Sequence, residues 1–501
     1  MLIRPDRDDL RMIGFTTGRV VYGVGVVILV PTLVALALRE WNDATAMAIG
    51  AMLAILLGQY TTVRLRSPQE LEWSHGMVTV ALSWLLAPLA FAVPLYLTGH
   101  FGSFVDAYFD AMSGLTTSGL SVMQDLDHIG VGVNLLRHIT HFAGGQGIVI
   151  VVLTVFASGG GQIGTLYVGE GRDERVVPNI IRTARFIYLI ATAWLLAGTA
   201  ALTLAGVLAG LTPWRALHHG INIFMAAFDT GGFSPNSTSI AYYHSATYEL
   251  VVTVLMIAGT LSFPVHYQLW RRQTRATTQH LETRTLALTT GLITLLALVG
   301  LVTAGTYADA TSLTRKGAFT IVSAHTGTGF TVVAPGIYVS DWGLFAPAAV
   351  VFAMALGGMA GSTAGGIKAI RIGLAGKSVL RDIRKAIAPM SSLVIASYRS
   401  RTRRVVRDEQ VRAAIVIIVL FLLTYLGGAL VGVFYGYRFD QALFESTSAA
   451  ANVGLSIGIV GPVTPTPLKL TYIAQMYLGR LEFMAAFALL GYGVALVRGR
   501  V

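Results

Sequence analysis

The sequence predicts an all-α polytopic membrane protein with about ten transmembrane helices and four re-entrant pore-loop hairpins in a pseudo-fourfold arrangement. Of its 501 residues, 54% are hydrophobic and only 12% are charged, which is about half the charged share of an ordinary soluble domain. Several apolar stretches exceed the roughly 18 residues expected of a spanning helix. Four short glycine-containing segments also look alike, and each lies where a hydrophobic hairpin would turn back on itself.

The ten expected spans follow one another along the whole chain. They lie near residues 20–39, 44–63, 75–98, 134–157, 184–209, 246–270, 285–306, 344–364, 411–435 and 468–496. Because the first apolar run is followed at once by others, we expect it to stay as a helix rather than to be cleaved as a signal peptide. The chain has no cysteine, which excludes disulfides and thiolate metal sites.

Basic residues gather in a few loops, at 4–19, 172–185, 271–284 and, above all, 368–412. This is the positive-inside pattern, which predicts that these loops and both termini are cytoplasmic. The net charge of +11 therefore does not indicate a nucleic-acid partner. No Lys or Arg occurs from Ser67 to Leu136, where several acids do occur. These acids could concentrate cations at the outer face, or outer loops could simply lack the positive bias.

A moderately apolar segment, too short to span twice, precedes each glycine segment. The pattern is helix, short re-entrant helix, loop, helix, and it occurs four times. It divides the chain into an N-terminal two-helix addition at 1–73 and four pore repeats at 74–182, 183–283, 284–409 and 410–501.

The four glycine segments are the main candidate site. Glycine-containing backbone placed around one axis can offer rings of carbonyl oxygens that replace the water around a cation. Non-helical backbone at membrane depth is tolerated only where protein buries it or water reaches it. The predicted ion-binding residues are Thr116, Thr117, Ser118, Gly119, Asp229, Thr230, Gly231, Gly232, Thr326, Gly327, Thr328, Gly329, Ala451, Asn452, Val453 and Gly454.

A second glycine cluster interrupts the eighth expected span. Each glycine costs a helix about 1 kcal/mol relative to alanine, so five within ten residues should unwind or bend it. A flexible intramembrane loop beneath the four segments is one interpretation, and close helix packing through small residues is the other. The residues concerned are Gly357, Gly358, Gly361, Ser362, Thr363, Gly365, Gly366 and the following Lys368.

Arg480 lies near the middle of the last expected span, where a charge costs at least about 2.5–3.5 kcal/mol. It should therefore face protein or water, either in the pore or in a structural pair with an acid. Glu482 is two residues on and points to another helical face. Glu445 and Asp110 could shape the potential at the outer mouth or serve as hydrogen-bond partners of neighbouring backbone. His138 and His141 lie three apart, but with no third ligand apparent a packed role is favoured over metal binding.

Four strings carry a family resemblance: DAMSGLTTSGLSV, AAFDTGGFSPNS, GGMAGSTAGGIK and ESTSAAANVGLS. In this order and placement they resemble the Trk/Ktr/HKT superfamily of cation transporters, specifically the TrkH-type membrane subunits of bacterial potassium uptake systems. The resemblance implies that the four segments form a selectivity filter, and glycine at all four aligned positions implies potassium as the transported ion. It also implies that the second glycine cluster is a gate, and that Arg480, in LGRLEF, is an electrostatic barrier in the pore.

The resemblance further implies a multi-pass protein of the bacterial cytoplasmic (inner) membrane that works as a homodimer with a cytosolic, nucleotide-binding TrkA-type regulatory subunit. The basic segment at 368–412 would contact anionic lipids or dock that regulator. The chain itself has neither a P-loop nor a Rossmann fingerprint, and no bound cofactor is expected. Two positions depart from the family pattern: Asp229 stands where Asn is usual, and His325 stands where Arg or another polar residue is frequent.

Besides a channel-like pore, two other classes of function are considered for this sequence. The first is a proton- or sodium-coupled cation symporter with the same fold, in which His325, Asp229 or Glu445 would carry the coupling. The second is an intramembrane enzyme. It is disfavoured because no G-x-S-G or H-E-x-x-H string places a nucleophile or a metal in a helix.

Overall fold

The computed structural model describes residues 5–67, 73–147, 180–389, 392–400 and 402–499. Within these ranges the chain is predominantly helical, which confirms the predicted fold class. Six helices are long and apolar enough to cross a membrane. They are α1 (Arg7–Ala37), α2 (Trp41–Arg64), α3 (Trp73–Leu97), α8 (Ile180–Leu208), α13 (Leu281–Ala304) and α18 (Asp408–Phe434).

Four short helices precede the four glycine segments, as the repeat pattern predicts. They have 12 to 16 residues, so at 1.5 Å per residue they are only about 18–24 Å long. That is short of the roughly 30 Å hydrocarbon core, so none of them spans. They are α4 (Phe104–Leu115), α9 (Pro213–Phe228), α14 (Ala310–His325) and α19 (Phe439–Ala450).

Two of the helices that follow the glycine segments are broken, so the prediction of continuous spans at 246–270 and 468–496 is wrong. The span at 344–364 is interrupted, as its glycine cluster predicts. One pair bends by 108° and another by 107°, while the third helix is only 11 residues long. The fourth helix ends at Gly147, and residues 148–157 of its predicted span lie outside the described part of the chain. The helices are α10 (Ala246–Thr260) with α11 (Phe263–Trp270), α20 (Thr466–Arg480) with α21 (Met484–Arg498), α16 (Phe345–Ala355) and α5 (Val131–Gln146).

Local chemistry explains two of these breaks. Pro264 has no N–H, and inside a helix its ring would clash with the carbonyl of Thr260, so the chain turns at Leu261 and Ser262. Between α20 and α21, Glu482 and Phe483 both have positive φ angles, of 49° and 70°. Positive φ cannot continue a right-handed helix. The remaining elements are η1 (Ser239–Tyr243), α12 (Thr274–Gln279), α15 (Ile337–Ser340), α17 (Ala369–Ile387), β1 (Ser397–Arg399) and β2 (Arg403–Val405).

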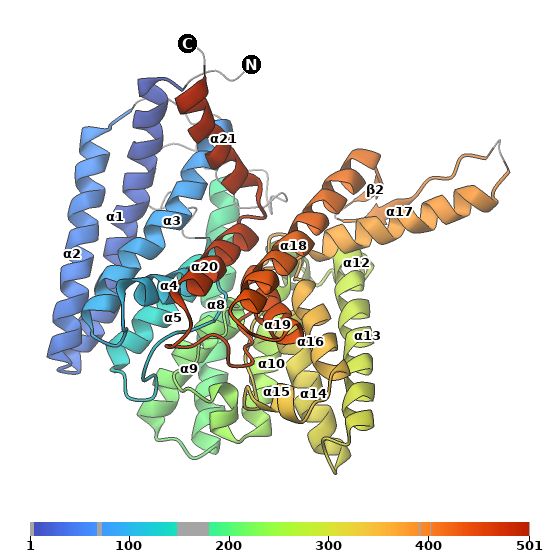
Figure 1. The fold of residues 1–501 in the computed structure, drawn as a ribbon, viewed down its shortest axis with the longest axis horizontal. Helices are drawn as coiled ribbons and strands as arrows, with labels where there is room; N and C mark the ends of the chain where they lie inside the picture. Colours follow the sequence, from blue (N-terminus) through green and yellow to red (C-terminus); the bar gives the residue numbers. More distant parts are fainter. Residues whose placement is uncertain (1–4, 68–72, 148–179, 390–391, 401, 500–501) are drawn as a thin grey trace.

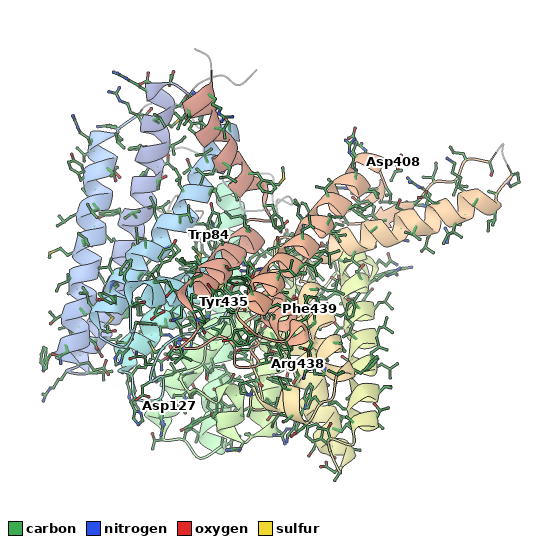
Figure 2. The ribbon with its side chains drawn as sticks, viewed as in Figure 1. Trp84, Asp127, Asp408, Tyr435, Arg438 and Phe439 are labelled. Atoms are coloured by element: carbon green, nitrogen blue, oxygen red, sulfur yellow. The ribbon has the colours of Figure 1, made fainter. Side chains whose placement is uncertain are left out.

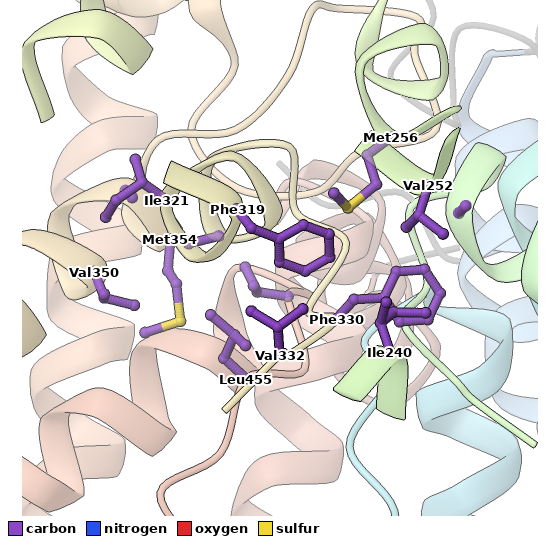
Figure 3. Packing of buried hydrophobic residues seen from close by; sticks show 14 of the residues in the cluster. Ile240, Val252, Met256, Phe319, Ile321, Phe330, Val332, Val350, Met354 and Leu455 are labelled. Atoms are coloured by element: carbon purple, nitrogen blue, oxygen red, sulfur yellow. The ribbon is translucent and has the colours of Figure 1, made fainter. Parts of the chain in front are cut away.

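Figure 1 shows α1 and α2 side by side along one edge of the molecule, with α3 next to them. The two N-terminal helices lie so close together that a Cβ atom at Gly58 would overlap the backbone of Tyr22. Glycine at this position therefore permits their contact. The beginning of α1 and the end of α21 lie at the same end of the molecule, and α17 projects to one side. Figure 3 shows the apolar core around the third segment, where Phe319, Phe330 and Met354 pack together.

Candidate cation pathway

The four glycine segments form a closed ring. A Cβ atom at Gly119 would overlap the carbonyl oxygen of Gly231, and one at Gly232 would overlap that of Thr328. In the same way Gly329 lies against the carbonyl of Val453, and Gly454 lies against that of Ser118. Each segment therefore touches the next in chain order, and the fourth returns to the first.

Every segment leaves its short helix through the same turn. In the first segment the amides of Thr116, Thr117 and Ser118 donate to carbonyls of α4 at 2.8, 3.1 and 2.8 Å, and the other three segments repeat this pattern. The ring glycine of each segment has a positive φ angle: Gly119, Gly232, Gly329 and Gly454. The residue two positions before each of them also has a positive φ angle: Thr117, Thr230, Gly327 and Asn452. A side chain in this conformation costs roughly 1–2 kcal/mol, so the turn is imposed by its surroundings.

These turns leave carbonyl oxygens available at the axis. Among the described residues, no backbone amide outside the helices and strands donates to the carbonyls of Ser118, Gly231, Thr328 or Val453. A hollow of about 160 Å3 is lined by all four ring glycines and by residues that follow them, such as Leu120, Phe233 and Leu455.

The side chains of the predicted site residues mostly serve the scaffold. Thr116 and Ser118 bond at 2.8 Å, as do Thr326 and Thr328, and Gln146 donates to the Asp229 carboxylate at 2.7 Å. Asn452 joins the first segment to α20, because its Nδ2 lies 2.9 Å from both Ser118 Oγ and Met476 O. The structure thus brings all four predicted segments together, and these polar side chains bond to neighbouring residues of the scaffold.

Residues 356–368, between α16 and α17, fold into a non-helical loop against the four segments, so the predicted interruption is present. Thr363 Oγ1 lies 3.1 Å from the carbonyl of Phe228, 2.9 Å from that of Gly259 and 3.2 Å from Thr230 Oγ1. Gly365 touches the Ala451 carbonyl, and Gly357 touches that of Gly365. These contacts leave no room for a Cβ, so glycine here permits both the fold of the loop and its approach to the ring.

Arg480 ties this loop to the first repeat. Its guanidinium donates to Thr363 O at 2.6 Å, to Gly144 O at 2.7 Å and to Thr117 Oγ1 at 3.1 Å. It also lies 5.3 Å from the ring of Trp84, which Figure 2 places beside α20. A cavity of only about 20 Å3 remains between Arg480 and the loop, room for about one water molecule. Arg480 and the loop therefore pack closely together beneath the four segments.

Charged groups hold the loop, and their pairing was not evident from the sequence. Ala360 N donates to Glu282 Oε1 at 2.8 Å. Lys368 Nζ donates to the carbonyl of Ala364 and lies 3.9 Å from Glu482, which also pairs with Arg371. In the structure Glu282 and Arg371 lie in the first turns of α13 and α17, and Glu482 lies at the break between α20 and α21. For Glu482, the available signal in the sequence was a charge near the middle of a predicted span.

The acids considered for the outer mouth have structural partners instead. Arg137 Nε lies 2.8 Å from Asp110 Oδ2, and both side chains are almost fully buried. The Arg137 guanidinium also stacks 4.1 Å from the ring of Phe233, just after the second segment. Glu445 accepts hydrogen bonds from Ser456 Oγ and from the amides of Ile457, Ile459 and Val460, after the fourth segment. Both acids therefore fix loops that follow ring segments.

The histidines lie off the ring axis as well. His141 Nδ1 lies 2.7 Å from Gly114 O, and its Nε2 accepts the amide of Phe233 at 3.1 Å, so it joins the first two segments. His325 Nε2 lies 2.8 Å from Thr289 Oγ1 on α13. Within the described ranges, no group of three His, Cys, Asp or Glu residues could hold a metal ion.

The buried Arg137–Asp110 pair makes a clear prediction for stability. Arg137→Met should lower the free energy of unfolding by about 3–5 kcal/mol, because it leaves an uncompensated buried carboxylate. Thermal and denaturant unfolding of the purified protein would measure the loss. The exposed Arg438–Asp440 pair is the matched control, since Arg438→Gln should cost less than about 1 kcal/mol. Equal losses in the two variants would contradict the structural role given to Arg137.

A polytopic helical fold, four short helices ending on one carbonyl ring and a loop beneath that ring together define a membrane transport protein rather than an enzyme. The TrkH family model, described as a cation transport protein, matches residues 44–490. The chain therefore belongs to the TrkH family of cation transport proteins.

Named relatives cover almost the whole chain. A Trk system potassium uptake protein TrkH of Halomonas elongata is 29% identical over 500 residues, covering 96% of this chain and 98% of that protein. An uncharacterized cation transporter of Methanocaldococcus jannaschii is 29% identical over 488 residues, 97% of each chain. The crystal structure of the potassium transporter TrkH from Vibrio parahaemolyticus superposes with a TM-score of 0.81 at 25% identity, covering 96% of this chain and 98% of that one.

Proposed function

We propose that this chain moves potassium ions across the bacterial cytoplasmic membrane, with the four glycine segments as its selectivity filter. The observation that carries the proposal is the closed ring, in which each glycine lies against a carbonyl of the next segment. Such carbonyl oxygens can replace the hydration shell of a potassium ion. The names of the Halomonas and Vibrio relatives, which are potassium uptake proteins and transporters, support the choice of ion.

Potassium flux into proteoliposomes tests this function directly. Vesicles with the purified chain should take up potassium faster than empty vesicles, and sodium or choline in its place should be taken up far more slowly. A chain that inserts and folds but moves none of these cations would contradict the proposal.

A proton- or sodium-coupled symporter with the same fold is the second candidate. The observation that favours it is Asp229, a fully buried carboxylate within the second ring segment, where a coupling ion could bind. Against it, His325 faces Thr289 on α13 and Glu445 is engaged by the loop after the fourth segment, so neither of the other predicted coupling residues lies on the axis.

We propose that the loop at 356–368 is the gate, with Gly357, Gly358, Gly361, Ser362, Thr363, Gly365, Gly366, Lys368 and Arg480 as its residues. The support is its position against the ring and the small size of the cavity, about 20 Å3, between the loop and Arg480. Opening would require the loop to leave Thr230, Phe228 and Gly259, which hold Thr363.

Gly361→Ala and Gly365→Ala should both raise potassium flux. Gly361 has φ +73° with no atom near a substituted Cβ, whereas a Cβ at Gly365 would overlap the Ala451 carbonyl. The first change strains the closed loop by roughly 1–2 kcal/mol and the second pushes the loop from the filter, so each should increase flux by about five- to thirtyfold. Gly376→Ala on α17, where a Cβ meets nothing, is the control. If potassium flux is unchanged in both loop variants, the assignment of this loop as the gate is wrong.

We further propose that the end of the molecule carrying the beginning of α1, the end of α21 and the basic segment at 368–412 faces the cytoplasm. The distribution of Lys and Arg supports this orientation. We also propose that the chain forms a homodimer and that a TrkA-type regulatory subunit docks on this side. The relatives' names, which place those proteins in a Trk system, support a regulatory partner. Co-purification of the chain with such a subunit, and its loss when the basic segment is neutralised, would test the docking.

A further inference from the structure

A cavity of about 520 Å3 lies where α12, α13, α17 and the β1–β2 hairpin meet. Figure 1 shows these elements grouped at one end of α13. Four of the nine lining residues are basic and none is acidic: Arg284 from α13, Lys377 from α17, and Arg399 and Arg403 from the hairpin. We propose that this cavity binds a phosphate group, supplied by the headgroup of an anionic phospholipid.

The hairpin that carries two of these arginines is firmly anchored. Tyr398 is buried in an apolar cluster with Leu281 of α13, Leu374 of α17, and Val406 and Val411. The strands pair in a fixed antiparallel register, with Ser397 opposite Val405 and Tyr398 opposite Arg404. The cavity is therefore held by packing against three helices.

That register places Arg399 directly opposite Arg403. Directly opposed residues of two antiparallel strands lie on the same face, and like charges in this position destabilise the pair. An anion bound between the two guanidinium groups would replace this repulsion by attraction. Binding of a phosphate group between the two arginines would therefore stabilise the hairpin.

Neutral groups orient the arginines. Arg399 donates to Gln279 Oε1, Arg403 Nε donates to Ser397 Oγ at 3.0 Å, and Arg284 Nε donates to Thr278 O at 3.0 Å. Since a guanidinium has five N–H donors, each of these arginines keeps further donors for a ligand. Across the described residues, none of the four cavity cations forms an ion pair. Asp382 and Asp408 on α17 and α18 are both bound by Arg381.

Two features of the cavity indicate that its ligand is a phosphate group carried by a lipid. Several arginines around one space favour phosphate, because their planar forks match its oxygens. Arg284 lies in the first turn of α13, a helix that can span the membrane, so the cavity lies at headgroup level. Basic pockets of this kind, on the cytoplasmic side, bind anionic headgroups. The choice of lipid rests on the orientation proposed above.

The test uses the full chain in nanodiscs of phosphatidylcholine, with or without phosphatidylglycerol, and measures the melting temperature. Phosphatidylglycerol should raise the melting temperature of the wild type. The double variant Arg399→Gln with Arg403→Gln should need about twenty-five-fold more anionic lipid for the same rise, since each of the two basic residues contributes about fivefold in affinity. In phosphatidylcholine alone this variant should melt at or above the wild-type temperature, because the cross-strand repulsion is gone.

The matched control is Arg384→Gln with Arg404→Gln, which removes the same charge from α17 and β2 outside the cavity. It should respond to phosphatidylglycerol as the wild type does. If the hairpin variant fails to fold, Arg284→Gln tests the same cavity without changing the hairpin. It should also weaken the rise in melting temperature caused by phosphatidylglycerol.

An equal response in the cavity and control variants would overturn the proposal, as would no response in the wild type. Inorganic phosphate and ADP, added to phosphatidylcholine nanodiscs, distinguish the source of the phosphate. Saturable stabilisation by either, without an effect of phosphatidylglycerol, would overturn the lipid assignment. Potassium flux is measured separately, so absent flux with a normal lipid response would contradict the transport function alone.

Discussion

Arg480→Gln should raise potassium flux by about tenfold. The arginine lies between the carbonyl ring and the loop, bonded to Thr117, Gly144 and Thr363. A cation passing about 6 Å from its guanidinium would meet a repulsion of about 3 kcal/mol at an effective dielectric constant near 20. Part of that barrier should remain in the variant, because the loop still narrows the pathway. Flux assays in proteoliposomes, normalised to inserted protein, measure the change.

Arg480→Lys separates the two ways in which this residue could close the pore. Lysine keeps the positive charge but cannot reproduce the guanidinium fork that reaches three acceptors on three parts of the chain. If charge forms the barrier, the lysine variant should keep flux near the wild-type level. A large rise in the lysine variant would instead indicate that hydrogen bonds hold the gate shut, and a fall in the glutamine variant with normal expression would contradict a blocking role altogether.

Gly119→Ser should lower the preference for potassium over sodium by at least about tenfold, equivalent to about 1.4 kcal/mol. The serine Cβ would overlap the carbonyl of Gly231, so the first two segments must move apart or the ring must tilt. Either change alters the field of carbonyl dipoles that the ion meets. Competitive flux of potassium against sodium measures the ratio.

Gly99→Ser is the matched control, because Gly99 also has a positive φ, of 80°, and nothing lies within 4 Å of a substituted Cβ. It carries the same backbone strain without the carbonyl overlap. Selectivity should therefore survive in Gly99→Ser and decline in Gly119→Ser. If both variants retain selectivity, the first segment does not belong to the filter.

The sequence was sufficient to predict the helical membrane fold, the four short helices and the position of each glycine segment. These features are local: apolar length, a repeated string and the cost of glycine in a helix all lie within a few dozen residues. The interruption of the helix after Ala355 was predicted for the same reason, from five glycines in ten residues. The roles of the ring and loop residues in transport stay predictions.

What the sequence did not reveal depends on residues that are far apart. Asn452 reaches Ser118 across 334 positions, and Lys469 lies 2.5 Å from Asp106 across 363. No periodicity in one chain indicates such pairs, so Asp110 and Glu445 could equally have faced the outer mouth. The bends after Thr260 and Arg480 were also missed, because apolar composition continues through both of them while the backbone turns by more than 100°.

The reversal potential of the wild-type chain under opposed potassium and sodium gradients is the most direct test of the carbonyl ring as a potassium pathway. We predict a reversal potential that follows the potassium gradient and does not move when the proton or sodium gradient is changed. A potential that moves with the proton or sodium gradient would contradict a pore and favour the coupled symporter. A potential near zero under opposed potassium and sodium gradients would show that the ring does not select.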